Sequence, residues 1–202
     1  MSIYRRSTTM SKPKIAIIVG STRETRIGLD AAEYVYSIAK DRDDLTFEIV
    51  DLKDYALPFF DEPASNAFVP PSHAGAVRWQ KKLTEFDGFL FIVAEYNGSI
   101  TAALKNALDY ANPEWIRKTA AFFSYGSLGG SRAVQHLKEI CIELQMAPVR
   151  NSVVLQGADF FAVYLNQKKV NEFRYMDPLV VDMLDQLAWW TKALKDAREK
   201  TA

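Results

Sequence analysis

The sequence is poor in the residues that build metal clusters and disulfide frameworks. Its 202 residues include one cysteine, Cys141, and two histidines, His73 and His136. A single cysteine excludes an intrachain disulfide and any Cys-x-x-Cys site, and two histidines this far apart in sequence are too few for a zinc cluster. The sequence therefore predicts a cytoplasmic protein, kept in a reducing compartment, without a metal site.

Neither sign of charge is in excess, and no hydrophobic run is long. The 25 lysines and arginines balance 25 aspartates and glutamates, and the isoelectric point is about 6.7. A general nucleic-acid binder needs a surplus of cations to meet the phosphates. A membrane span needs roughly 18 consecutive apolar residues, which the chain does not contain. We therefore expect neither nucleic acid nor membrane as a partner.

Two glycine-rich nucleotide signatures are also missing. The chain has no G-x-x-x-x-G-K-[ST] loop, so triphosphate hydrolysis loses its main support, and it has no G-x-G-x-x-G turn. Asp51 stands where a ribose-binding acid stands in dinucleotide-binding folds. Without the glycines, we interpret Asp51 as a residue that simply ends a strand.

Apolar sequence is abundant, with 49% hydrophobic and 12% aromatic residues, which is too rich for a disordered chain. The first dozen residues are polar and carry three basic positions, without the apolar segment of a secretory signal. We expect a disordered N-terminal tail at residues 1–12 and a single domain at residues 13–202.

Buried strands and amphipathic helices alternate along this domain. Strands are predicted at 15–19, 45–50, 89–93, 119–124 and 151–155, and helices from 28, at 73–86, at 99–110, after 131 and at 177–198. Residues 52–72 are expected to form a long loop, and 157–177 are left unassigned. Strands that are apolar throughout indicate a parallel sheet covered on both faces. The predicted fold is an α/β, flavodoxin-like three-layer sandwich with a five-stranded parallel sheet of order 2-1-3-4-5 and helices on both faces.

In such a sheet, ligands bind beyond the carboxyl ends of the strands. The first of these loops, residues 20–28, leads straight into a helix and carries three hydroxyls and two arginines, Arg23 and Arg26. Helix N-termini and arginines both favour phosphate. The alternative interpretation of this loop is an ordinary helix cap whose arginines are solvated. The combination of three hydroxyls, two arginines and a helix N-terminus favours a binding site for a phosphate monoester.

The other two loops are less specific when taken alone. Residues 95–99 fit either a capping turn, with positive φ at Asn97 and Gly98 and Ser99 as the helix cap, or a site for a planar ring with polar edges. The residues alone leave these two interpretations even. The glycine-rich loop at 124–132 is more often a plain turn, but three such loops on adjacent strand ends strengthen one another.

These loops resemble the NADPH-dependent FMN reductase family. The similarity rests on G-S-T-R from Gly20 with Arg26, on E-Y-N-G-S from Glu95 followed by L-K-N-A-L-D-Y, and on Y-G from Tyr125 with the later Gly-Gly pair. It covers residues 15–155 and implies the flavodoxin-like fold, bound FMN, NAD(P)H as co-substrate, and a homodimer or homotetramer. A proline usually precedes the E-Y-N segment, and Ala94 in its place predicts a slightly looser turn.

The resemblance also assigns cofactor-binding residues in three groups. The phosphate group comprises Ser21, Thr22, Arg23 and Arg26, completed by Ile27 and Gly28. The group along the pyrimidine side of the flavin, acting mainly through the backbone, comprises Glu95, Tyr96, Asn97 and Gly98. The group on the other side and at the nicotinamide entry comprises Ser124, Tyr125, Gly126, Gly129 and Gly130. No catalytic side chain is expected, because flavin N5 carries the hydride.

The expected function is that of an FMN-dependent NAD(P)H oxidoreductase. It would pass hydride through the flavin to a quinone, azo compound, oxidised metal ion or free flavin by a ping-pong mechanism. An electron carrier like flavodoxin is the first alternative, and the neutral net charge and the arginines disfavour it. A flavin-sensing module without turnover is the second.

Overall fold

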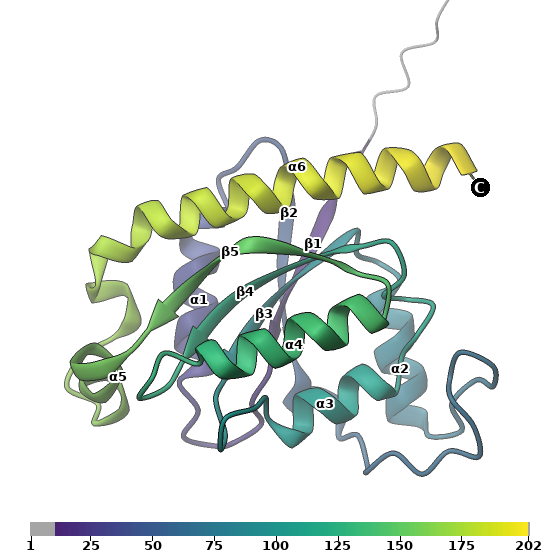
Figure 1. The fold of residues 1–202 in the computed structure, drawn as a ribbon, viewed down its shortest axis with the longest axis horizontal. Helices are drawn as coiled ribbons and strands as arrows, with labels where there is room; N and C mark the ends of the chain where they lie inside the picture. Colours follow the sequence, from purple (N-terminus) through teal and green to yellow (C-terminus); the bar gives the residue numbers. More distant parts are fainter. Residues whose placement is uncertain (1–10, 202) are drawn as a thin grey trace, which may run out of the picture.

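Five parallel strands form the centre of the structure, a computed structural model that describes residues 11–201 (Figure 1). The strands are β1 (Lys14–Val19), β2 (Thr46–Asp51), β3 (Gly88–Ala94), β4 (Thr119–Tyr125) and β5 (Ala147–Leu155). They are ordered β2-β1-β3-β4-β5, and every neighbouring pair is parallel. The predicted flavodoxin-like order is confirmed. The predicted tail lies outside the described residues except for Ser11 and Lys12.

Helices cover both faces of the sheet and divide the core in two. On one face lie α1 (Gly28–Ala39) and α6 (Asp177–Thr201), and on the other lie α2 (Ala74–Leu83), α3 (Ala102–Asp109) and α4 (Ser131–Glu143). Alternate strand residues serve alternate faces: Ile17 packs in the α1–α6 core, whereas Ile18 packs in the α2–α3–α4 core. Both are fully buried, as expected for strands that are apolar throughout. No helix in residues 11–201 is both long enough and apolar enough to cross a membrane.

Several element boundaries differ from the prediction by one to four residues, and two of the differences have a clear physical reason. Strand β5 begins at Ala147, four residues early, and contains Pro148. Proline argues against a central strand but is tolerated at a sheet edge, where β5 lies. Helix α3 begins at Ala102 and is capped by Thr101, whose side chain accepts a hydrogen bond from the Leu104 N–H at 3.0 Å. Ser99 is not the cap, because it closes the preceding turn.

Both segments without a predicted element contain short helices. A 3₁₀ turn, Leu52–Tyr55, follows β2, and helix α5 (Gly157–Tyr164) follows β5. Two more 3₁₀ turns, Val170–Glu172 and Arg174–Met176, lead into α6. Only Val163 of α5 is buried, so the helix lacks the continuous apolar stripe that sequence patterns detect. Figure 1 places α5 beyond the carboxyl ends of the strands.

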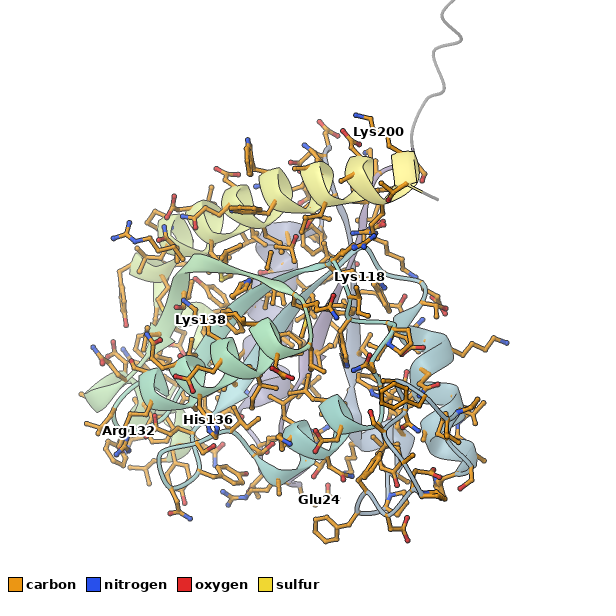
Figure 2. All side chains as sticks on the ribbon, turned by 45° about the vertical axis from the view of Figure 1, so that its right-hand side comes forward. Glu24, Lys118, Arg132, His136, Lys138 and Lys200 are labelled. Atoms are coloured by element: carbon orange, nitrogen blue, oxygen red, sulfur yellow. The ribbon has the colours of Figure 1, made fainter. Side chains whose placement is uncertain are left out.

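Lys118 is a buried lysine just before β4, at the amino end of the sheet (Figure 2). Its Nζ donates a hydrogen bond to the Leu83 carbonyl oxygen at 3.2 Å and lies 5.4 Å from the centre of the Phe89 ring. Burial lowers the pKa of Lys118 to about 8, and the nearby Arg198 contributes to the decrease.

This lysine makes folding stability depend on pH. Between pH 8 and 10.5 the unfolded chain holds the Lys118 proton and the folded chain has released it, so raising the pH stabilises the fold. One pKa unit is worth about 1.4 kcal/mol, so the free energy of unfolding should rise by about 1–3 kcal/mol. In the Lys118→Met variant, the free energy of unfolding should not show this increase between pH 8 and 10.5. Urea unfolding of both proteins at several pH values in this range measures the difference. Parallel pH profiles would contradict the assignment.

Candidate functional site

Loops from three strand ends and one helix enclose a cavity of about 150 Å³ at the carboxyl edge of the sheet. Its lining residues are Ser21, Arg23, Thr25, Arg26, Ile27, Ala94, Glu95, Tyr96, Tyr125, Gly126, Phe160 and Tyr164. The first five follow β1, the next three end or follow β3, and Tyr125 and Gly126 end or follow β4. Phe160 and Tyr164 belong to α5. The structure therefore brings the three predicted loops together around one cavity.

The loop after β1 begins at Gly20, whose backbone is hydrogen-bonded to β3 and to the start of α3. The Gly20 N–H donates to the Ile92 carbonyl oxygen at 3.0 Å, and the Thr101 hydroxyl donates to the Gly20 carbonyl oxygen. A Cβ at Gly20 would lie 2.8 Å from the Ile92 oxygen, so only glycine fits. Beyond it, the N–H groups of residues 21–25 donate to no other group of the described chain. They form a row of available donors just before α1.

The two arginines of this loop have different surroundings. Arg23 is exposed, and its guanidinium lies against the hydroxyls of Tyr96 and Tyr164, which raise its pKa above the ordinary value. Arg26 instead forms an ion pair with Asp51, and its side chain is 9% exposed. It also donates to the Arg23 carbonyl oxygen at 3.0 Å.

The pairing with Asp51 corrects the expectation that Arg26 is available to a phosphate. Asp51 ends β2 and stands in register with Val19, the last residue of β1, so the sheet order brings its carboxylate to the loop. Both terminal guanidinium nitrogens of Arg26 are occupied, and only its buried Nε lacks a partner. Asp51 also accepts from the Lys53 N–H at 3.0 Å, in keeping with its predicted place at a strand end.

The loop after β3 contains the predicted turn. Asn97 and Gly98 have φ angles of 52° and 83°, and Tyr96 and Ser99 exchange two backbone hydrogen bonds of 2.9 and 3.1 Å. Neither Asn97 nor Gly98 lines the cavity. The Glu95 N–H is also occupied, by the Tyr125 carbonyl oxygen at 3.2 Å. Side chains of this loop, more than its backbone, therefore face the cavity.

Two side chains of the loop after β3, Tyr96 and Glu95, line the cavity and carry polar atoms. The Tyr96 hydroxyl is 3.0 Å from the Ser21 hydroxyl, which ties the first loop to the second. The Glu95 carboxylate is 6% exposed, and its Oε1 accepts hydrogen bonds from Arg132 at the start of α4 (Figure 2). Its other oxygen, Oε2, is buried without a partner.

The third loop is shaped by three residues that do not line the cavity, Ser124, Gly129 and Gly130. The buried Ser124 hydroxyl donates to the Gly129 carbonyl oxygen at 2.7 Å. Gly129 and Gly130 have φ angles of 76° and 77°, in the region that favours glycine. These residues fix the shape of the turn, and Gly126 is the glycine that reaches the cavity.

Tyr125 lines the cavity, but its side chain is only 6% exposed and its hydroxyl lies under Gly28. Burial raises the pKa of Tyr125, although a hydrogen bond from the Gly28 backbone opposes the increase. Little of the ring is therefore accessible from the cavity. The ring supports the start of α1 from below, because β4 directs it toward that face of the sheet.

Not every residue assigned from the sequence lines this cavity, and two aromatic residues that line it were not assigned. The assigned residues that do not line it are Thr22, Gly28, Asn97, Gly98, Ser124, Gly129 and Gly130. Thr22 points to a separate cavity of about 200 Å³ lined by Leu52 and Asn106. Phe160 and Tyr164 were missed, although their four-residue spacing would place both rings on one face of a helix. Their rings are stacked with centroids 5.8 Å apart.

The arrangement suits a planar ring that carries an anionic group. Five buried side-chain polar atoms lack a partner in the described chain, and two of them, the Arg26 Nε donor and the Glu95 Oε2 acceptor, belong to residues lining this cavity. A buried polar atom without a partner is costly unless a ligand completes it. Free N–H groups before α1 fit a phosphate, and the rings of Tyr96, Phe160 and Tyr164 fit a flat ligand.

Comparison with known proteins agrees with this geometry. The chain is 38% identical over 146 residues to an NAD(P)H-dependent FMN reductase of Nectria sp, covering 68% of this chain and 73% of that one. It is 31% identical over 140 residues to a 2-hydroxy-1,4-benzoquinone reductase of Burkholderia sp, covering 66% and 72%. The structure resembles FerB, a flavoenzyme NAD(P)H:(acceptor) oxidoreductase from Paracoccus denitrificans, with a TM-score of 0.68, 22% identity and coverage of 90% and 98%. The model of the NADPH-dependent FMN reductase family matches residues 13–160, and the chain belongs to that family of oxidoreductases.

Proposed function

We propose that the protein binds FMN in the cavity at the carboxyl edge of the sheet and uses it to pass hydride from NAD(P)H to a small-molecule acceptor such as a quinone. The observation that carries this proposal is the row of unpaired N–H groups at residues 21–25, next to a cavity lined with aromatic rings. FMN combines a phosphate monoester with a flat polar ring, and when bound it supplies the hydride chemistry.

The phosphate would be held by the first loop. Backbone N–H groups of residues 21–25 and the Ser21 hydroxyl donate to it, and Arg23 adds a charge-assisted contact. Arg26 acts mainly by fixing the loop to Asp51. Its buried Nε is a further donor without a partner in the described chain.

The ring system would be bound by the other loops and α5. Glu95 Oε2, which has no partner in the described chain, would accept a hydrogen bond from a ring N–H. Tyr96 and Phe160 provide apolar contact. At about 150 Å³ the cavity is smaller than the roughly 300–1,000 Å³ usual for ligand sites, so the flavin would extend past its rim and remain open to a second substrate.

Assembly and location belong to the same proposal. Trp189 and Trp190 on α6 are 64% and 43% exposed. Such an exposed aromatic pair supports a homodimer or homotetramer, in which a second copy covers part of this surface. The single cysteine is buried, which fits the reducing cytoplasm.

Steady-state kinetics test the reaction. If one flavin face serves donor and acceptor in turn, NAD(P)H must leave before the acceptor enters. Double-reciprocal plots of NADPH oxidation at several menadione concentrations should then be parallel. Intersecting lines would contradict the shared face, and bound flavin without NADPH oxidation would favour the electron carrier or the sensing module.

A further inference from the structure

A second, larger cavity of about 460 Å³ lies beside the proposed flavin site. Its lining residues are Glu24, Thr25, Arg26, Ile27, Asp30, Val163, Tyr164, Asn166, Lys168 and Lys169. It shares Thr25, Arg26, Ile27 and Tyr164 with the flavin cavity, so the two are contiguous. Its volume falls within the roughly 300–1,000 Å³ range of small-molecule sites.

Two lysines give this outer cavity its available positive charge. No ion pair of the described chain includes Lys168 or Lys169, and both residues are exposed. The Lys168 Nζ lies 5.2 Å from the centre of the Phe173 ring. The Lys169 backbone N–H, and not its ammonium group, donates to the Glu172 carboxylate at 2.6 Å.

The acidic residues of the cavity are already occupied. Glu24 accepts from the Lys53 ammonium at 2.7 Å, and Asp30 accepts from the Val170 N–H at 2.9 Å. Arg26 is neutralised by Asp51, but its buried Nε remains without a partner. The cavity is thus lined by two consecutive lysines without ion pairs in the described chain, and a buried guanidinium donor lies on the wall it shares with the flavin cavity.

Tyr164 supplies the apolar component of the same surface. Its ring is stacked on Phe160, it is 52% exposed, and it lines both cavities. An exposed ring next to cationic groups suits a nucleotide, in which a flat base adjoins a phosphate. Tyr164, Lys168 and Lys169 follow residue 160, where the match to the family model ends.

We propose that the outer cavity binds the phosphorylated adenosine half of NADPH, with the 2′-phosphate between Lys168 and Lys169. The inference rests on the proposed function, in which NAD(P)H brings its nicotinamide to a flavin in the inner cavity. Two lysines that line the cavity without ion pairs match a dianionic monoester, which NADPH carries and NADH does not. The chain should therefore prefer NADPH over NADH.

Calorimetric titration of the flavin-loaded protein with 2′,5′-ADP tests the site without turnover. We expect 2′,5′-ADP to bind more tightly than 5′-AMP. Lys168→Ala and Lys169→Ala should each weaken 2′,5′-ADP binding about 3-fold, and the double variant about 10-fold, in keeping with exposed charge pairs. Lys81→Ala is the matched control, because Lys81 is exposed on α2 and has no ion pair in the described chain. Equal affinity of the wild type and the double variant, or no binding, would overturn the proposal.

Kinetics provide the second readout. The double variant should raise the KM for NADPH about 10-fold and the KM for NADH by much less. Equal increases for both dinucleotides would overturn the assignment to the 2′-phosphate. Failure of the proposed function has a different signature: lysine-dependent 2′,5′-ADP binding would persist, with no oxidation of either dinucleotide.

Discussion

Replacing Arg23 with alanine is expected to weaken FMN binding about 10- to 100-fold and to leave riboflavin binding almost unchanged. Arg23 is the exposed guanidinium of the phosphate loop, since Arg26 is occupied by Asp51. A hydrogen bond to a charged group contributes roughly 1.5–3 kcal/mol, and riboflavin has no phosphate with which to form it. Quenching of flavin fluorescence by the apoprotein measures both affinities.

The control variant is Arg150→Ala. Arg150 is an exposed arginine on β5 outside the cavity, and its removal should change neither affinity. Arg23 also touches the hydroxyls of Tyr96 and Tyr164, which line the site of the ring. An equal loss for FMN and riboflavin would show that Arg23 acts by positioning these tyrosines, and would contradict its assignment to the phosphate.

Gly129→Ala should lower the free energy of unfolding by about 2–6 kcal/mol, from roughly 1–3 kcal/mol of backbone strain and a similar cost of overpacking. The φ angle at Gly129 is 76°, and an added Cβ would lie 2.2 Å from Val154 Cγ1. The turn that this glycine shapes forms one wall of the flavin cavity, so FMN affinity should fall as well. Urea unfolding and the flavin titration measure the two effects.

Gly157→Ala separates backbone strain from steric conflict. Gly157 has a φ angle of 56°, but an added Cβ there would have no atom within 4 Å. The expected loss is about 1–2 kcal/mol, the cost of the left-handed conformation alone. If both variants lost the same stability, the close contact with Val154 would not be the cause.

The fold was predictable because the three central strands, β1, β3 and β4, are buried along almost their whole length. The continuous runs at residues 15–19 and 89–93 have to be buried on both faces, and only a parallel sheet between helix layers provides that. The sheet order then places the carboxyl ends of β1, β3 and β4 side by side. The three loops of the candidate site could therefore be located without coordinates.

Side-chain partners within the site were beyond the reach of the sequence. Arg26 and Asp51 are 25 residues apart and meet because β1 and β2 are in register, so an arginine that suits a phosphate is used inside the loop. Helix α5 escaped detection for a different reason. Its aromatic residues are divided between the cavity and solvent, with Phe161 47% and Tyr164 52% exposed, and so do not form an apolar stripe.

The visible absorption spectrum of the purified protein after incubation with FMN and gel filtration tests the central claim most directly. We expect one FMN to stay bound per chain and its oxidised absorption to bleach when NADPH is added without oxygen. A protein that emerges colourless would contradict flavin binding at the carboxyl edge of the sheet. A bound flavin that neither NADPH nor NADH bleaches would contradict the assignment as a reductase.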